Sequence, residues 1–259
     1  GIAPVVRIAD RELDELELSP GVLDSACAAI STASRPARIA VRGRAGSGRR
    51  TLLAGFAKRA GRALGVIDAS LLPRDAERFS IALCSALRRA QLAGLVPVVS
   101  GLEDKIFDER TGCDLAHDIL AAHPGPLAVI APPGAAMPLP VGHAVIDLPP
   151  LSEGERVGIW RCAIEDARGW LRDVDGLAAR YRVGAGVIHR AVSAVAGRTA
   201  ANGGESPPLD DQIDAFLRQS RDARLADHAR RVERLARWSD LVLPSDVMDS
   251  LRELVGRVR

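Results

Sequence analysis

The sequence predicts an α/β fold: a five-stranded parallel sheet with helices on both faces, followed by a small helical domain. Two observations lead to this prediction. Five short apolar, β-branched runs recur in the first 150 residues, and helix-length segments separate the first four of them. Strands that alternate with helices form parallel sheets, because each crossover helix returns the chain to the edge where the previous strand began. After Pro150 only helical patterns follow.

The expected strands and helices follow one another in order along the first 150 residues. Each apolar run has the length of one strand, and the runs lie at 37–43, 64–70, 95–101, 126–133 and 143–150. The helix-length segments between the first four runs lie at 50–64, 74–94 and 114–123. Helices on both faces bury every side chain of a strand, which explains why the runs are nearly continuously apolar.

The second part of the chain is helical in pattern from its first residues. Ser152 and Glu155 have the spacing of a capping box, and Trp160 and Ile164 follow at helical spacing. A mobile, polar loop rich in Gly and Pro is expected at 201–208. Further helices are expected at 174–181, 184–200 and 209–220.

These patterns divide the chain into four regions. A helical lead-in is expected at 1–36, the α/β domain at 37–150, a helical lid domain at 151–220, and a linker helix with the start of a following, truncated domain at 221–259. The chain begins without Met and ends within an amphipathic helical pattern, so we expect a piece of a longer protein.

Composition and charge argue against several classes of protein. The net charge of +2 is close to neutral, so neither nucleic acid nor a membrane surface is indicated as a partner. The Arg-rich segment 218–237 is interleaved with acidic residues, which favours a solvated linker helix over nucleic-acid binding. No apolar run approaches the roughly 20 residues of a transmembrane helix and no signal peptide is recognisable, so we expect a soluble, cytoplasmic protein. The cysteines and histidines form no set with metal-ligand spacing, which predicts reduced thiols and no metal site.

One glycine-rich stretch has a pattern that points to a ligand. The sequence GRAGSGRRT, at 43–51, follows the first expected strand and precedes a helix. Glycines let several backbone N–H groups converge on an anion, and the start of the helix adds a positive field. A plain glycine-rich turn with exposed arginines is the alternative. The residues expected to bind nucleotide or phosphate are Gly43, Gly46, Ser47, Gly48, Arg49, Arg50 and Thr51.

Two positions of this stretch differ from a working phosphate-binding loop. In the motif G-x-x-x-x-G-K-[ST], framed here by Gly43 and Gly48, the Lys position holds Arg49 and the Ser/Thr position holds Arg50. A guanidinium is bulkier than the ammonium that reaches the β- and γ-phosphates. A cation at the Ser/Thr position repels the Mg²⁺ that a hydroxyl would bind. Thr51 is one residue late, which on a helix rotates its hydroxyl by about 100°.

The motifs, in this order, resemble those of the AAA+ ATPases over most of the chain. RIAVRGRAGSGRRTLLAGFAKRAG is similar to their first strand, Walker A loop and first helix, LVPVVSG to the Walker B strand, and PLAVIAPP to the sensor 1 strand. HAVIDLPPLSEGERVGIWRCAI is similar to the fifth strand and the start of the helical lid, and YRVGAGVIHRAVSAV to the lid segment around sensor 2. Within the family, the sequence most resembles the degenerate N-terminal AAA+ domain of bacterial tandem-AAA+ proteins, including those encoded with contractile injection systems.

The catalytic positions of that family are substituted in this chain. The Walker B strand ends in Ser100 and Gly101 instead of an Asp-Glu pair, and Glu103 and Asp104 come too late, as expected for solvated residues at a helix start. The sensor 1 strand ends in Ala-Pro-Pro, and no Arg precedes the fifth strand as an arginine finger. Arg190 matches the neighbourhood of sensor 2, with an exposed helix arginine as the alternative.

The resemblance therefore implies a hydrolysis-deficient AAA+ module with no catalytic residue, which acts as a regulatory or assembly domain. ATP or ADP is the expected ligand if nucleotide binds, and Mg²⁺ is not expected. The expected partners are a downstream AAA+ domain of the same chain and further copies in a homo-oligomeric ring. Two alternatives stay open: an active ATPase that uses Arg49, Thr51 and Glu103 or Asp104 in an altered geometry, and a protein-binding scaffold without nucleotide affinity.

Overall fold

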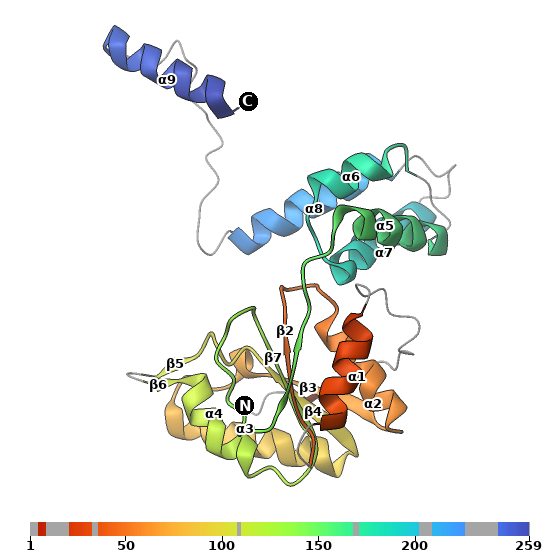
Figure 1. The fold of residues 1–259 in the computed structure, drawn as a ribbon, viewed down its shortest axis with the longest axis vertical. Coiled ribbons are helices and arrows are strands. Elements are labelled where there is room, and N and C mark those ends of the chain that lie inside the picture. The colour runs from red at the N-terminus through yellow and green to blue at the C-terminus, as the bar shows by residue number, and fades with distance from the viewer. Residues whose placement is uncertain are drawn as a thin grey trace. The chain divides into compact units, whose positions relative to one another are not determined.

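The computed structural model describes residues 5–8, 21–32, 36–107, 110–167, 171–201, 209–225 and 243–258 (Figure 1). The chain forms two compact units, 1–213 and 214–259, whose border falls within one helix. The predicted division of the chain into an α/β domain at 37–150 and a lid at 151–220 stays a prediction. Of the loop expected at 201–208 only residue 201 is described, and the linker residues 226–242 also lie outside the described ranges.

The main sheet of the first unit has six strands. Neighbouring strands pair in parallel, except that the first strand pairs antiparallel with the third. The α/β class and the five parallel strands predicted from the sequence are therefore confirmed. In spatial order the strands are β1 (Val5–Ile8), β3 (Ala63–Asp68), β4 (Leu95–Ser100), β7 (Leu127–Ala131), β2 (Arg38–Arg42) and β8 (Ala144–Asp147).

The sixth strand, β1, corrects the predicted count of five. It lies within 1–36, where the sequence predicts a helical lead-in, and this region contributes α1 (Val22–Thr32) as well as the strand. Among the described residues β1 pairs only with β3, and its four residues include Arg7, so it lacks the continuous apolar run by which the buried strands are recognised. A short hairpin of β5 (Ile106–Phe107) and β6 (Arg110–Thr111) was likewise not predicted, because two-residue strands leave no periodicity to read.

Helices cover both faces of the main sheet (Figure 1). One face packs against α1 and α2 (Arg49–Arg59), and the other against α3 (Ala76–Leu92) and α4 (Gly112–Ala121). Adjacent residues of β2 show how the sequence specifies both layers. Ala40 belongs to the core beneath α3 and α4, whereas Val41 belongs to the core beneath α1 and α2, and both are fully buried.

The helical part of the first unit begins with the capping box that the sequence predicts. The Ser152 hydroxyl accepts a hydrogen bond from the Glu155 N–H (3.3 Å), and the Glu155 carboxylate accepts one from the Ser152 N–H (2.6 Å). Trp160, one of the largest buried side chains, then packs in the interior. Arg156 is buried and donates to the carbonyl of Ala178 (2.9 Å), which ties two helices together. These helices are α5 (Glu153–Asp166), α6 (Val174–Arg180), α7 (Ala185–Ala201) and the start of α8 (Asp210–Leu225).

The second unit is described for the later part of α8 and for α9 (Ser245–Val258). Arg218 and Asp214, one turn apart on α8, form an ion pair of 2.6 Å. α9 begins at Ser245, directly after Pro244, and covers most of the amphipathic helical pattern with which the sequence ends.

The order of the strands brings several strand ends to one edge of the sheet. β2 lies between β7 and β8, and β4 lies beyond β7. Because these strands are parallel, the loops that follow them lie at the same edge. Open parallel sheets bind their ligands at the carboxyl ends of the strands, at the point where the strand order reverses. The loop after β2 therefore lies where a ligand is expected.

Candidate functional site

The glycine-rich loop joins the carboxyl end of β2 to the start of α2. The Gly43 N–H donates to the carbonyl of Ala131 at the end of β7 (3.2 Å), and the Ser47 N–H donates to the Arg44 carbonyl (3.1 Å). Gly48 is the N-cap of α2, and it provides no side chain to satisfy the first N–H groups of the helix. This arrangement leaves those N–H groups for an anion, as a phosphate-binding loop requires.

Two positions of the loop need glycine. Gly46 and Gly48 have φ angles of 86° and 90°, in the left-handed region that residues with a Cβ rarely adopt. A Cβ at Gly46 would also overlap a methyl group of Val187 at the start of α7, whereas one at Gly48 would meet nothing within 4 Å. The loop thus packs directly against α7 at Gly46.

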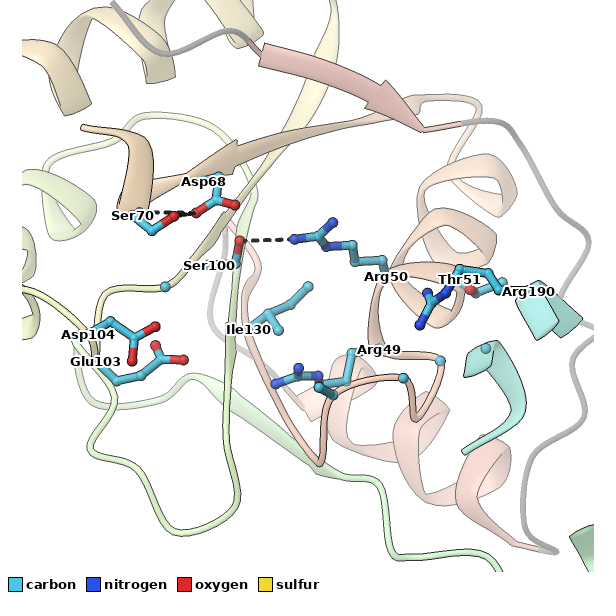
Figure 2. A pocket seen from close by; sticks show the side chains of 15 residues that line it. Arg49, Arg50, Thr51, Asp68, Ser70, Ser100, Glu103, Asp104, Ile130 and Arg190 are labelled. Atoms are coloured by element: carbon cyan, nitrogen blue, oxygen red, sulfur yellow. Dashed lines mark hydrogen bonds between the residues drawn. The ribbon is translucent and has the colours of Figure 1, made fainter. Parts of the chain in front are cut away.

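A pocket of about 380 Å³ opens beside the loop. Figure 2 shows the arginines of the loop on one side of it and carboxylates on the other. Its charged lining residues are Arg49, Arg50, Arg190, Asp68, Glu103 and Asp104. The predicted site residues that line the pocket are Gly46, Gly48, Arg49, Arg50, Thr51 and Arg190.

The other two predicted residues, Gly43 and Ser47, belong to the loop but do not line the pocket. Gly43 is buried, and a Cβ at this position would stand 3.1 Å from the Cβ of Leu148 and 2.8 Å from the Ser47 hydroxyl oxygen. That hydroxyl is buried and has no hydrogen-bond partner among the described residues. Neither residue lines the pocket, so their contribution is to the shape of the loop.

Arg49 is held by the protein itself. Its Nη1 donates to the carbonyl of Ala131 (2.7 Å), at the end of the strand that resembles sensor 1. Partial burial lowers the pKa of Arg49, and the nearby Glu103 carboxylate acts in the opposite direction. Because Ala131 has no polar side chain, its backbone carbonyl is the group that this strand end offers, and Arg49 binds it.

Arg50 reaches across the pocket from α2 to the end of β4. Its Nη2 lies 3.5 Å from the hydroxyl oxygen of Ser100, a long hydrogen bond that Figure 2 marks. Ser100 is buried at the carboxyl end of β4, where the resemblance places the Walker B carboxylate. The two positions expected to surround a metal ion are therefore occupied by a guanidinium and a hydroxyl that contact each other.

The acidic side of the pocket includes residues that the sequence analysis did not select. Asp68 ends β3, beside Ser100 in the register of the sheet, and its carboxylate accepts hydrogen bonds from the N–H (3.0 Å) and hydroxyl (2.6 Å) of Ser70. A Cβ at Gly101 would stand 3.2 Å from the Asp68 carboxylate. A carboxylate from the neighbouring strand thus lies where the Walker B strand lacks one. The run LGVIDAS contains this Asp, but only the pairing of β3 with β4 reveals its relevance.

Glu103 also lies in the pocket, in a turn and half-buried, and not at the solvated helix start that the sequence predicts for it. Burial raises the pKa of its carboxyl group, the charges of Asp104 and Asp68 act in the same direction, and Arg49 opposes them. A buried lysine holds this turn in place: Lys105 Nζ donates to the carbonyl of Leu72 (2.6 Å), in the loop after β3.

The helix α7 meets the glycine-rich loop at a glycine. The N–H of Gly186 donates to the carbonyl of Gly46 (3.0 Å), and a Cβ at Gly186 would stand 3.2 Å from that carbonyl oxygen. Arg190, one turn further along α7, is exposed and reaches the rim of the same pocket. The structure therefore places Arg190, the residue proposed as sensor 2, beside the loop. The backbone of the same helix contacts the loop directly at Gly186.

Sequence comparison finds neither a protein-family model nor a curated protein that matches the chain. Solved structures do resemble it. RuvB from Thermotoga maritima, a Holliday junction branch migration motor, matches with a TM-score of 0.54 at 14% identity, over 77% of this chain and 68% of that one. A variant of the same RuvB with glycine in place of one proline matches with a TM-score of 0.53 at 13% identity, over 82% and 74%. RuvB is an AAA+ ATPase. The chain has an AAA+ fold.

The AAA+ fold raises the question of whether these residues fit a Mg²⁺ ion. Mg²⁺ requires oxygen ligands in near-octahedral geometry. Arg50 offers only N–H donors at the position of the ligating hydroxyl, and Ser100 offers a neutral hydroxyl in place of a carboxylate. Among the described residues, no group of three or more His, Cys, Asp or Glu is arranged to hold a metal ion. The donor set of this pocket does not fit Mg²⁺.

Among the residues that the structure describes, no helix is both long enough and apolar enough to span a bilayer.

Proposed function

We propose that the chain is a degenerate AAA+ P-loop module with little or no ATP hydrolysis, which serves as a regulatory or assembly domain of a larger, ring-forming AAA+ ATPase. One observation supports this most. The pocket retains the glycine loop at Gly46 and Gly48, whereas the ends of the two adjacent strands present Ser100 and Ala131 in place of catalytic groups.

The chemistry of phosphoryl transfer explains why these replacements matter. Hydrolysis of ATP relies on a metal ion that neutralises the developing charge and on a residue that orients the attacking water. Ser100 and Gly101 supply neither function, and Ala131 has no polar side chain for the γ-phosphate. We therefore assign no catalytic residue and no metal to this module.

The same pocket supports binding of ATP or ADP through its backbone. The N-terminus of α2 and the left-handed glycines form the cradle in which phosphates bind in P-loop proteins, and Arg50 and Arg190 add positive charge. In this proposal the nucleotide is a structural ligand, whose binding changes the stability of the module and not the chemistry of ATP.

The proposed partners are a downstream AAA+ domain of the same chain and further copies of the chain in a ring. RuvB shares the AAA+ fold, and heterologous contacts between repeated copies generate closed rings. The amphipathic helix α9 follows the module and leaves Val247 41% exposed. Reading the coding sequence after Arg259 tests the downstream domain: an intact G-x-x-x-x-G-K-[ST] there is expected.

Hydrolysis is tested by steady-state phosphate release from ATP and Mg²⁺. We expect the rate of the 259-residue chain to equal that of a Gly48→Val variant, because Val is incompatible with φ of 90° at the N-cap and disrupts the cradle. Mg²⁺-stimulated release that disappears in Gly48→Val would contradict the proposal.

The carboxylates of the pocket favour one rival function, an active ATPase of altered geometry. Asp68 and Glu103 both line the pocket, and a carboxylate is the group that orients water in P-loop enzymes. If phosphate release is observed, Asp68→Asn and Glu103→Gln identify the responsible residue, since only the variant that lacks it loses turnover. If neither nucleotide binds under any condition, the chain is a protein-binding scaffold.

A further inference from the structure

We infer that Arg50 takes the place of the metal ion in this pocket, so that the site selects a metal-free polyphosphate over its Mg²⁺ complex. This inference rests on the proposed function, because it takes the pocket to be a nucleotide site. It starts from the misfit between the AAA+ fold and the donor set: the residue after the Walker lysine position and the end of the Walker B strand are Arg50 and Ser100.

The geometry places a positive charge between these two positions. Arg50 projects from the first turn of α2, and its Nη2 lies 3.5 Å from the hydroxyl oxygen of Ser100 at the end of β4 (Figure 2). In P-loop NTPases a Mg²⁺ ion lies between the corresponding hydroxyl and carboxylate and bridges the β- and γ-phosphates. The guanidinium therefore fills the space in which the ion would neutralise the phosphates.

Arg50 is better suited to this role than Arg49. Arg49 is half-buried, donates to the carbonyl of Ala131 and interacts with Glu103, whereas Arg50 is exposed to the pocket and contacts a neutral hydroxyl. A guanidinium offers several N–H donors in a planar fork, which matches two phosphate oxygens at once. Metal-free ATP or ADP brings those oxygens without a competing cation.

The charges around the pocket make the Mg²⁺ complex the weaker ligand. A divalent ion on the phosphates would stand close to Arg50, and Ser100 has no negative charge to offset the repulsion. Of the remaining carboxylates of the pocket, Asp68 lies beside Ser100 and accepts two hydrogen bonds from Ser70, whereas Glu103 and Asp104 lie in the turn after β4. The described residues form no group arranged to hold a metal ion. We expect excess Mg²⁺ to weaken the binding of ATP.

Calorimetric titration of the 259-residue chain tests the inference. The probes are ATP and ADP, each with EDTA and with excess Mg²⁺, and tripolyphosphate with EDTA, which separates recognition of the polyphosphate from recognition of the nucleoside. The variants are Arg50→Thr, which restores the ligating hydroxyl, and Arg50→Gln, which keeps length but not charge. Arg44→Thr is the matched control: it removes the same charge from an exposed residue of the same loop that does not line the pocket.

The expected result has three parts. The unchanged chain binds ATP more tightly in EDTA than in Mg²⁺. Arg50→Thr and Arg50→Gln each weaken binding in EDTA by at least about tenfold, the loss expected for one charge-assisted hydrogen bond, while Arg44→Thr changes it by less than about threefold. Arg50→Thr reverses the sign of the Mg²⁺ effect.

Several results would overturn the inference. It fails if ATP binds only with Mg²⁺, if the Arg50 variants bind metal-free ATP as well as the unchanged chain does, or if no polyphosphate binds at all. The first two failures are separable from failure of the proposed function, because phosphate release decides the latter: binding can require Mg²⁺ in a module that never turns over. If no polyphosphate binds, the protein-binding scaffold replaces both proposals. The melting temperature of each variant shows whether it is folded, and a folded Arg50→Gln decides the matter if Arg50→Thr is not.

Discussion

The contact between the glycine-rich loop and α7 predicts that Gly46→Ala destabilises the first unit far more than Gly48→Ala does. Both glycines have left-handed φ angles, so an alanine at either position incurs a backbone penalty of about 1–2 kcal/mol. Only at Gly46 does the new Cβ meet a neighbour, the Cγ2 methyl of Val187. Overpacking of this kind costs about 1–3 kcal/mol more.

The free energy of unfolding is therefore expected to fall by about 2–5 kcal/mol in Gly46→Ala and by about 1–2 kcal/mol in Gly48→Ala. A second substitution isolates the contact. The Cβ of Val187 stands 3.6 Å from the added carbon, an ordinary contact distance, so Val187→Ala removes the overlap and leaves the rest of the geometry in place. The double variant Gly46→Ala/Val187→Ala should recover most of the excess loss.

Chemical denaturation of the four proteins, the unchanged chain and the single and double variants, measures the coupling energy in a double-mutant cycle. Hydrogen exchange of the Gly186 N–H, which donates to the Gly46 carbonyl, reports whether α7 has separated from the loop even where global stability is little changed. Equal losses for Gly46→Ala and Gly48→Ala, together with no rescue by Val187→Ala, would refute the packing of α7 on the loop.

Three further predictions follow from titratable groups. Burial, and to a lesser degree the charge of Arg38, lower the pKa of His123. The stability that comes from the neutral His123 is therefore present above its ordinary pKa of 6.5 and is lost as pH falls below that value. Urea midpoints should fall between pH 7.5 and 5, and His123→Phe should remove this pH dependence. Burial raises the pKa of Glu103, so protonation of this carboxyl group as pH falls should tighten polyphosphate binding. Calorimetry should show that Glu103→Gln binds polyphosphate more tightly than the unchanged chain at pH 7.5, without the pH dependence that Glu103 contributes. The hydrogen bond from Arg42 lowers the pKa of Asp147, but the pair is exposed (29% and 61%), so Asp147→Asn should cost less than about 1 kcal/mol at pH 7, and this difference should vanish below the ordinary pKa of 3.8 in thermal melts.

Most strands of the parallel sheet were predictable because they are largely buried on both faces. A strand such as β7, whose five residues LAVIA are all buried, has no polar position and reads as a continuous apolar run. The edge strand β1 was not predictable by the same argument, since in the part of the chain that the structure describes it pairs only with β3, and its Val6 is 53% exposed. Burial on both faces therefore made most of the strands predictable. The other edge strand, β8, alternates buried and exposed residues, and it was predicted because its exposed Val145 is also apolar.

The pocket was only partly predictable, because its two sides come from different kinds of information. The loop side is continuous in sequence, so spacing alone brought Gly46, Arg49 and Arg50 together. The acidic side depends on β3 lying next to β4, which places Asp68 beside Ser100, and strand order is a property of the whole sheet. Glu103 was misjudged for a similar reason: the turn that holds it is fixed by a hydrogen bond from Lys105 to a carbonyl 33 residues away.

The substituted residues of the pocket are matched to one another, which argues against simple decay of an ATPase site. Under the proposed function, Arg49 stands at the Walker lysine position and donates to the carbonyl of Ala131, which has no polar side chain. Arg50 stands at the position of the metal-ligating hydroxyl and contacts the hydroxyl of Ser100. Arg49 is half-buried, where a long charged side chain loses conformational entropy and hydration, and its hydrogen bond to the Ala131 carbonyl offsets this cost. Each of these arginines at the start of α2 thus contacts the end of a strand, Arg49 that of β7 and Arg50 that of β4. A phosphate bound at the glycine-rich loop would meet the positive charges of Arg49 and Arg50 already in position. The contacts of these two arginines are therefore the physical reason to expect that the pocket binds an anion without hydrolysing it.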